Sequence, residues 1–312
     1  MYLVTGGAGF IGSHIVETLV AQGEAVRVLD NFCTGRRGNL AGLLPRIELV
    51  EGDLADPGTV RRAMRGVAYV LHQGALPSVP RSVAEPLVSH ASNATGTLNV
   101  LVAALEAGVR KVVYASSSSV YGDLPGLPKD EEMPTRPLSP YGVTKLMGEH
   151  YCAVFSQLHG LPTVSLRYFN VFGPRQDPAS QYAAVIPRFI QAMLAGQRPT
   201  IYGDGGQSRD FTYVGDVVRA NLAAARQPTT GALVLNAACG RRYSLLELVA
   251  YLNGILGTQI EPRFDPPRPG DIRHSQAAVE RLAQTLGLRL DTPLEEGLRR
   301  TVAWLRGAAA DG

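Results

Sequence analysis

Short apolar runs alternate with longer stretches of mixed apolar and polar residues through the first half of the chain. The apolar runs are rich in valine and leucine, as is typical of strands that are buried on both faces of a parallel sheet. The longer stretches have the pattern of helices. We expect strands at residues 2–5, 25–30, 47–51, 69–72, 111–116 and 163–167, with helices at 10–22, 57–64, 83–107 and 140–159 between them.

After about residue 170 this alternation weakens, and segments rich in glycine and proline separate the elements. The remaining patterns predict a strand at 232–237 and helices at 214–225, 244–255, 277–287 and 293–305. Strands that alternate with helices indicate an α/β fold. We therefore predict a Rossmann-type doubly wound parallel sheet in residues 1–170, to which a segment near 210–240 returns. A smaller, mixed domain is expected in residues 171–312, interleaved with the first.

The composition is that of an ordinary globular protein. The 312 residues are 45% hydrophobic and 18% charged, with a formal net charge of +3. So weak a charge gives no reason to expect binding to nucleic acid or to a membrane surface. The histidines and the three cysteines lack the spacing of metal ligands or of a disulfide framework. We expect a cytoplasmic protein with no secretory signal, no membrane-spanning helix and no metal.

A glycine loop follows the first predicted strand and opens the first helix. Gly6, Gly9 and Gly12 are spaced G-x-x-G-x-x-G, a variant of the more common G-x-G-x-x-G pattern. Glycine permits a tight turn and lets the backbone approach a pyrophosphate, and the helix N-terminus offers free N–H groups. The loop therefore predicts a site for a dinucleotide cofactor.

Two acidic residues follow the next strands. Asp30 ends the second strand, where a carboxylate accepts bonds from the ribose hydroxyls and repels a 2′-phosphate. This favours NAD, although Arg36 and Arg37 nearby leave NADP open. Asp53, after the third strand, is either an adenine-binding residue or a turn and helix-capping residue.

The candidate catalytic pair is Tyr141 and Lys145. Ser139 and Pro140 are typical of a helix start, so the two side chains share one helix face. A phenol titrates near pH ~10, and a neighbouring ammonium lowers that pKa. Tyr141 is then suited to remove a proton from a hydroxyl while hydride leaves the same carbon. The serine run 116–119 ends the preceding strand, at the edge of the sheet where ligands bind.

Together, these motifs resemble the extended short-chain dehydrogenase/reductase family, and within it the nucleotide-sugar 4-epimerases. The segments at 167–174, 209–214 and 268–271 match the same group, so the resemblance covers nearly the whole chain. It implies a catalytic set of Ser117, Tyr141 and Lys145. It implies NAD contacts at Gly6, Gly9, Phe10, Ile11, Gly12, Asp30, Asn31, Asp53, Leu54, Ala75, Asn93, Lys145 and Phe169. It implies UDP-sugar contacts at Ser117, Asn170, Arg209, Arg268 and Ser275.

The resemblance also guides the choice of reaction. Dehydratases of the family carry Thr-Asp-Glu where this chain has Ser117 to Ser119, so an acid–base pair for elimination is missing. We therefore expect C4 epimerisation of a UDP-hexose, with NAD recycled through a 4-keto sugar. Ser275 falls at a position that gates the sugar by size, and its small side chain leaves UDP-N-acetylglucosamine open. UDP-glucuronate is open too, with Arg273 near its carboxylate.

A second class of function is a regulatory protein that binds NAD without catalysis. Such members of the family usually lose the tyrosine or the lysine, and this chain retains both. The segments 83–107 and 140–159 resemble the helices through which the family dimerises, so a homodimer is expected.

Overall fold

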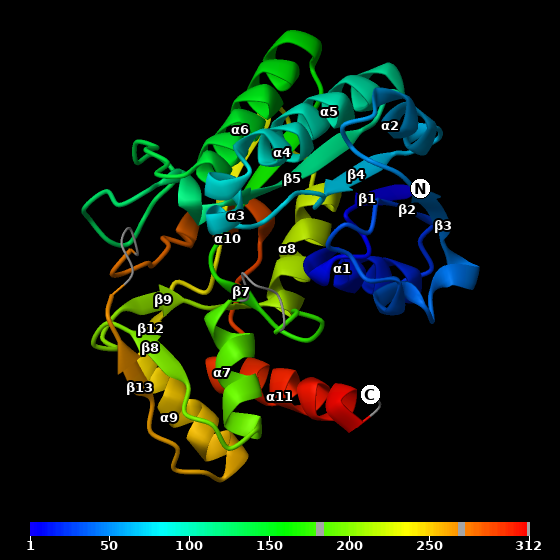
Figure 1. Cartoon of the computed structure of the whole chain (residues 1–312). Coiled ribbons are helices and arrows are strands. Elements are labelled where there is room, and N and C mark those ends of the chain that lie inside the picture. Colours follow the sequence, from blue (N-terminus) through cyan, green and yellow to red (C-terminus); the bar gives the residue numbers. More distant parts are fainter. Residues whose placement is uncertain (179–183, 268–271, 311–312) are drawn as a thin grey trace.

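A seven-stranded sheet forms the centre of the molecule (Figure 1). The computed structural model describes residues 1–178, 184–267 and 272–310. All neighbouring strands of the sheet are parallel. Their order across the sheet is β11 (Ala232–Ala237), β6 (Thr163–Tyr168), β5 (Lys111–Ser117), β4 (Tyr69–His72), β1 (Tyr2–Thr5), β2 (Val26–Asp30) and β3 (Glu48–Glu51). The predicted Rossmann-type fold is confirmed, and the predicted strand at 232–237 does return to the sheet.

Helices cover both faces of this sheet. Figure 1 shows α5 (Gly96–Glu106) and α6 (Pro140–His159) on one side and α1 (Phe10–Ala21) and α8 (Val214–Arg226) on the other. Because successive side chains of a strand point to opposite faces, Leu3 joins the core under α5 while Val4 joins the core under α1. The outer positions are taken by α2 (Pro57–Met64) and α10 (Glu280–Leu286), with the 3-10 turns η1 (Arg37–Leu40), η2 (Leu44–Arg46) and η4 (Ser118–Val120) in the loops.

The helix predicted at 83–107 is wrong in its first part. The chain forms α3 (Val79–Ala84), α4 (Pro86–His90), a π-helical turn η3 (Ala91–Thr95) and only then α5. Pro86 is the physical reason for the break, since a residue before proline is disfavoured in helical conformation. Glu85 accordingly has φ −130° and ψ 64°.

The second half packs around a core of its own. This core joins α7 (Val185–Leu194), α9 (Leu245–Leu256) and α11 (Leu294–Ala310). Short strand pairs surround it: β7 (Val171–Phe172) with β10 (Thr212–Tyr213), β9 (Ser208–Asp210) with β12 (Arg242–Ser244), and β8 (Thr200–Tyr202) with β13 (Arg263–Asp265). Within the described part of the chain, no helix is long and apolar enough to span a membrane.

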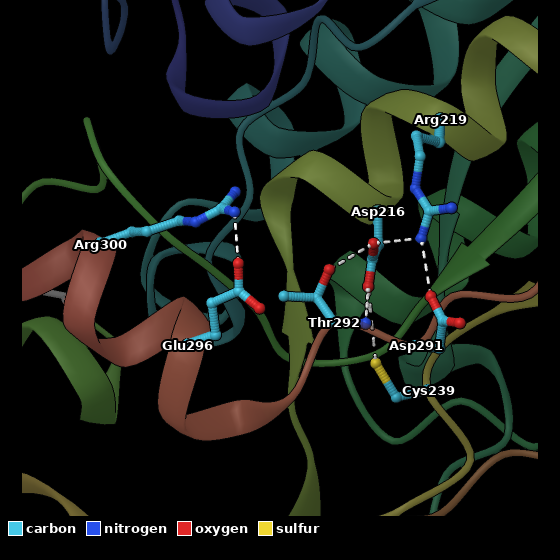
Figure 2. A network of polar contacts seen from close by, with 7 residues as sticks. All are labelled: Asp216, Arg219, Cys239, Asp291, Thr292, Glu296 and Arg300. Atoms are coloured by element: carbon cyan, nitrogen blue, oxygen red, sulfur yellow. Dashed lines mark hydrogen bonds and ion pairs between the residues drawn. The ribbon is translucent and has the colours of Figure 1, made fainter.

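Asp216 attaches the last part of the chain to the sheet half. This buried carboxylate on α8 accepts bonds from the Thr292 backbone N–H at 3.0 Å and from the Thr292 hydroxyl at 2.7 Å (Figure 2). Arg219 also pairs with Asp216, at 2.6 Å, and reaches Asp291 at 3.1 Å. Since Thr292 leads directly into α11, these contacts fix the start of that helix against α8.

Candidate active site

Two loops meet at the carboxyl edge of the sheet, between β1 and β4. The strand order reverses there, and doubly wound sheets bind ligands at such a point. Gly6 follows β1 with φ +64°, and Gly74 lies in the loop after β4. A Cβ on Gly6 would lie only 2.7 Å from the Gly74 Cα, so the close approach of the two loops requires glycine.

The glycine loop forms a cradle at the N-terminus of α1. Gly9 is the N-cap residue of this helix, and a Cβ on Gly12 would lie 2.1 Å from the Gly6 carbonyl oxygen. The backbone N–H groups of Phe10, Ile11 and Gly12 are in the first turn, where no intrahelical acceptor exists. They carry the positive end of the helix dipole, so the cradle suits the pyrophosphate of a dinucleotide.

The Asp30 carboxylate lies beside this cradle, at the end of β2. It accepts bonds from the backbone N–H groups of Ala8 at 2.9 Å and of Phe32 at 2.8 Å. A Cβ on Gly35 would lie 2.9 Å from one of its oxygens. Each carboxylate oxygen has a second lone pair, so the group retains the capacity to accept from ribose hydroxyls.

Arg36 and Arg37 are both engaged by acidic groups. Arg36 pairs with Asp177 at 2.6 Å. Arg37 pairs with Glu51, and its guanidinium lies 4.1 Å from the centroid of the Phe32 ring. Both ion pairs lie at the surface, so the preference for NAD over the 2′-phosphorylated cofactor rests on the Asp30 carboxylate.

The residues expected at the adenosine end lie together after β2 and β3. Asn31 donates to Asp53 at 2.8 Å, and Asp53 also accepts the Ala55 N–H at 2.8 Å. Asp53 therefore stabilises the turn after β3 and orients the Asn31 amide, and these bonds are compatible with either of the two readings of the sequence. Leu54 packs close to the second loop, since a Cβ on Gly74 would lie 2.6 Å from its Cδ1.

Ser117, Tyr141 and Lys145 meet at the end of β5. Ser139 caps α6 by accepting the Gly142 N–H at 3.1 Å, with Pro140 in the first helical position. The Ser117 hydroxyl lies near the Tyr141 phenol and acts to lower its pKa. Lys145 donates from Nζ to the Ala115 carbonyl at 2.8 Å, and Nζ lies 5.8 Å from the centroid of the Tyr141 ring.

The electrostatics of the pair differ from the expectation. Burial raises the pKa of Tyr141, and the nearby Ser117 hydroxyl opposes this only in part. Burial also lowers the pKa of Lys145 to about 7. The sequence had predicted that the ammonium lowers the pKa of the phenol, but in the protein alone desolvation of both groups is the larger effect.

A cavity of about 250 Å³ lies in the second half, beyond the end of β6. Asn170 lines it, two residues after Tyr168, which is paired with Ser117 across β6 and β5. Its other lining residues include Arg209, Phe172, Phe189 and Phe211. Two of the predicted substrate contacts therefore share one cavity, with both a guanidinium and aromatic surface.

Of the two remaining predicted substrate contacts, Ser275 and Arg268, the structure describes only Ser275. The Ser275 backbone N–H donates to the Ser208 carbonyl at 3.0 Å, and Arg209 also bonds this carbonyl at 3.0 Å. Ser275 is therefore joined to the strand that carries Arg209. Arg268 lies outside the described residues.

Two predicted cofactor contacts have side chains that point into the protein. Phe169 is fully buried in a cluster with Val120 and Tyr121. The Asn93 amide accepts the Leu76 N–H at 2.8 Å and donates to the Thr144 hydroxyl at 3.1 Å. Ala75, beside Leu76, is half-buried in the same loop.

Comparison with known proteins places the chain in a family. Residues 2–238 match the model of the NAD dependent epimerase/dehydratase family. The chain belongs to this family. The resemblance that the sequence motifs predicted is thereby confirmed.

Known epimerases of this family match almost the whole chain. The UDP-glucose 4-epimerase of Mycolicibacterium smegmatis is 40% identical over 308 residues, which are 97% of this chain and 98% of that protein. The UDP-glucose 4-epimerase of Thermus thermophilus, solved with NAD, is 41% identical with a TM-score of 0.89 and covers 98% and 99% of the two chains. The UDP-N-acetylglucosamine 4-epimerase of Methanobrevibacter ruminantium, in complex with UDP-N-acetylmuramic acid, is 40% identical with a TM-score of 0.94 and covers 98% of both.

Sequence reasoning missed several residues that shape the site of this family member. The Tyr141 backbone N–H donates to the Ser82 hydroxyl at 3.0 Å, a contact across 59 positions that no local pattern signals. Asp210, next to Arg209, is fully buried and accepts the N–H groups of Gly240 at 3.0 Å and Ala277 at 3.1 Å. Burial raises the pKa of Asp210 to about 7, against the effect of these donors. In the sequence, the position of Asp210 beside Arg209 was the local signal that could have drawn attention to this buried carboxylate.

Proposed function

We propose that this chain catalyses the NAD-dependent interconversion of UDP-glucose and UDP-galactose at C4. The observation that carries the proposal is the meeting of Ser117, Tyr141 and Lys145 at the end of β5, beside the glycine cradle. Two UDP-glucose 4-epimerases that match the chain over nearly its full length support it.

The cofactor part of the proposal rests on the fit of the cradle. Gly6, Gly9 and Gly12 with the first turn of α1 would hold the pyrophosphate, and Asp30 would hold the adenosine ribose. NAD, when bound, supplies the acceptor and donor of the C4 hydride, and its positively charged ring favours the phenolate of Tyr141. Lys145 is proposed to bind the nicotinamide ribose in addition to its effect on Tyr141.

Tyr141 is proposed as the proton shuttle. Its phenolate removes the proton from the C4 hydroxyl of the sugar as hydride leaves the same carbon, and a 4-keto sugar results. The Ser117 hydroxyl, near the phenol, is proposed to bond the reacting oxygen. The keto sugar turns over in the pocket, and Tyr141 returns the proton when hydride reaches the opposite face of C4.

The cavity beyond β6 is proposed as the site of the UDP group. Arginine forks suit the oxygens of a diphosphate, and Arg209 lines this cavity with Asn170. Arg268 is proposed to share this role. The aromatic residues of the cavity offer apolar surface to a base.

A second candidate reaction is 4-epimerisation of UDP-N-acetylglucosamine or UDP-glucuronate. Ser275, in the segment bonded to the Arg209 strand, is small and half-buried, and we propose that it leaves room for an N-acetyl group. The likeness to the Methanobrevibacter enzyme favours this candidate.

The same proposal extends to organisation and assembly. Residues 1–170 with the returning segment near 210–240 are proposed to bind NAD, and residues 171–312 to bind the nucleotide sugar. A homodimer is proposed through α4 and α6, where Leu87 is 83% and Leu158 is 69% exposed. A cytoplasmic setting in galactose metabolism completes the proposal.

One preparation of the purified protein tests the reaction. UDP-glucose, UDP-N-acetylglucosamine and UDP-glucuronate are each incubated with it, and the 4-epimers are separated by chromatography. We expect UDP-galactose from the first. Tyr141→Phe should lower turnover by about 10²- to 10⁴-fold and keep bound NAD, while Tyr151→Phe on the same helix serves as the control. Bound NAD without turnover of any of the three sugars would favour a regulatory protein.

A further inference from the structure

A chain of hydrogen bonds runs through the interior from the loop after β4 to the π-helical turn. The Gly74 N–H donates to the Thr5 hydroxyl at 3.1 Å. This hydroxyl lies 2.7 Å from Nδ1 of His72, and Nε2 of His72 lies 3.0 Å from the Thr97 hydroxyl. The Thr97 hydroxyl donates to the Asn93 carbonyl at 2.5 Å. The side chains of Thr5, His72 and Thr97 are all at most 1% exposed, so water does not compete for these bonds.

The direction of each bond follows from the number of protons available. A threonine hydroxyl has one proton, and Thr97 gives its proton to the Asn93 carbonyl. Thr97 therefore accepts from His72, which requires the proton on Nε2. Nδ1 is then an acceptor in a neutral ring, and Thr5 donates to it while accepting from Gly74. This tautomer alone gives every donor in the chain of hydrogen bonds an acceptor.

A cationic His72 would break this arrangement. With a proton on Nδ1, the Thr5 hydroxyl would accept from both neighbours, and its own proton would lose its acceptor. The Lys145 ammonium acts on the His72 ring, and the Tyr114 ring lies against the His72 ring with centroids 5.6 Å apart. Burial lowers the pKa of His72 to about 3, and Lys145 acts in the same direction.

Both ends of the chain reach the candidate active site. At one end, Thr5 and Gly74 adjoin Gly6, at the tight contact between the two loops. At the other end, Asn93 donates from its side chain to the Thr144 hydroxyl at 3.1 Å. Thr144 in turn donates to the Tyr141 carbonyl at 2.8 Å. The π-helical turn carries Asn93 here, and such turns are frequent at functional sites.

We propose that His72 is a positioning residue which, as the neutral tautomer protonated on Nε2, couples the cofactor loop to the first turn of α6. It touches neither cofactor nor substrate. It fixes the distance between the cradle at Gly6 and the phenol of Tyr141. This distance matters because the cofactor must take the hydride, and Tyr141 the proton, from the same carbon and its hydroxyl. Misplacement of reacting groups by about 1 Å costs up to about 10²-fold in rate.

The tautomer is tested on the unaltered protein by NMR of ¹⁵N-labelled histidine. We expect one ring with Nε2 protonated and Nδ1 bare, unchanged between about pH 5 and pH 8, where an ordinary histidine titrates. The signal is assigned by its loss in His72→Gln. A proton on Nδ1, or titration of the ring in this range, would overturn the proposal. This measurement needs no substrate, so it is independent of the proposed reaction.

The coupling is tested by a double-mutant cycle on turnover, which rests on the proposed function. Thr5→Val and Thr144→Val remove one hydroxyl at each end of the chain. Each should lower kcat by about 10-fold or more, with KM for the UDP-sugar unchanged because the Arg209 cavity is untouched. The double variant should lose little beyond the larger single loss, since one break already uncouples the loop from α6.

Thr163→Val is the matched control for this cycle. Thr163 is a buried threonine that donates to the Cys152 carbonyl at 3.2 Å, outside the chain. Its loss should leave kcat unchanged and combine additively with Thr5→Val. Losses at Thr5 and Thr144 that simply multiply would refute the coupling, even if the enzyme is active and its NAD is bound.

Discussion

At the scale of single residues, the catalytic pair has neutral neighbours. Lys145 donates to the Ala115 carbonyl, and the Ser117 hydroxyl lies near Tyr141. Burial therefore disfavours the charged form of each, which explains why the pKa values of the two groups move in opposite directions. A phenolate forms readily only when further positive charge enters the site, so proton removal is coupled to cofactor binding under the proposed function.

His72 gives a pH dependence of stability with a definite sign. Its pKa is lowered from 6.5 to about 3 in the folded protein, so the unfolded chain binds more protons below pH 6.5. Stability is fully present above that pH and is lost as the pH falls, by up to about 1.4 kcal/mol per pH unit. Urea unfolding at about pH 6.5 and 5.5 should give a smaller loss in His72→Gln than in the parent or in the exposed-site control His150→Gln. Equal losses in all three would contradict this.

A substitution at Gly12 tests the cradle by steric overlap with the backbone, without a change of charge. A Cβ at Gly12 would overlap the Gly6 carbonyl oxygen at 2.1 Å, so Gly12→Ala must open the loop. We expect the variant to fold but to copurify with little or no NAD, assayed after release by denaturation. Gly38→Ala is the control, since a Cβ at Gly38 would meet nothing within 4 Å. Full retention of NAD by Gly12→Ala would remove the cradle from the proposed site.

At the scale of elements, the register of α6 on β5 sets the active site. Two consecutive residues of β5 bond this helix: the Ala115 carbonyl accepts from Lys145, and the Ser116 hydroxyl bonds Glu149. Ser117, next along the strand, lies near the Tyr141 phenol. Glu149 also pairs with Arg167 of β6, at 2.7 and 2.9 Å, and both side chains are 5% exposed. A buried ion pair thus anchors the helix one turn beyond Lys145.

Breaking this pair on one side should be costly. Glu149→Gln leaves the buried Arg167 guanidinium without a counter-charge, and we expect a loss of about 3–5 kcal/mol in the free energy of unfolding. The double variant Glu149→Leu with Arg167→Met should recover much of that loss, because neither charge is then buried alone. Glu106→Gln, which removes an exposed partner of Arg61, should leave stability essentially unchanged. Denaturant unfolding measures all three, and a Glu149→Gln variant as stable as Glu106→Gln would contradict the anchor.

The limits of sequence reasoning are also clearest among the elements. The strands of the sheet, the glycine loop and the start of α6 follow from local patterns, since period, glycine spacing and capping residues are all written within a few positions. The inward direction of Asn93 does not, because its partners are Leu76 and Thr144, distant in the chain. The break before Pro86 had a local signal, but helical periodicity on both sides of it outweighed that signal in the prediction.

At the scale of the whole molecule, the chain crosses repeatedly between the sheet half and the second half, each with hydrophobic core of its own. It leaves the sheet after β6, returns through α8 and β11, and leaves again for α9. Asp216 and Thr292 then join the start of α11 to α8. The candidate cofactor cradle and the Arg209 cavity therefore lie in halves that covalent crossings and buried polar bonds tie together. Such a molecule is expected to unfold as one unit under denaturant, rather than as two independent domains.

The face of α4 and α6 gives a prediction for assembly. The two helices pack together, and both carry apolar residues that a monomer would leave in water, among them Leu87, Val154 and Leu158. Exposed apolar side chains on two packed helices are typical of an interface, and a twofold dimer would bury them against the same helices of its own copy. We expect the parent to be a dimer by sedimentation, and Leu87→Glu with Leu158→Glu to be a folded monomer. Leu246→Glu on α9 replaces another exposed leucine and should remain dimeric. A monomeric parent would exclude dimerisation through α4 and α6.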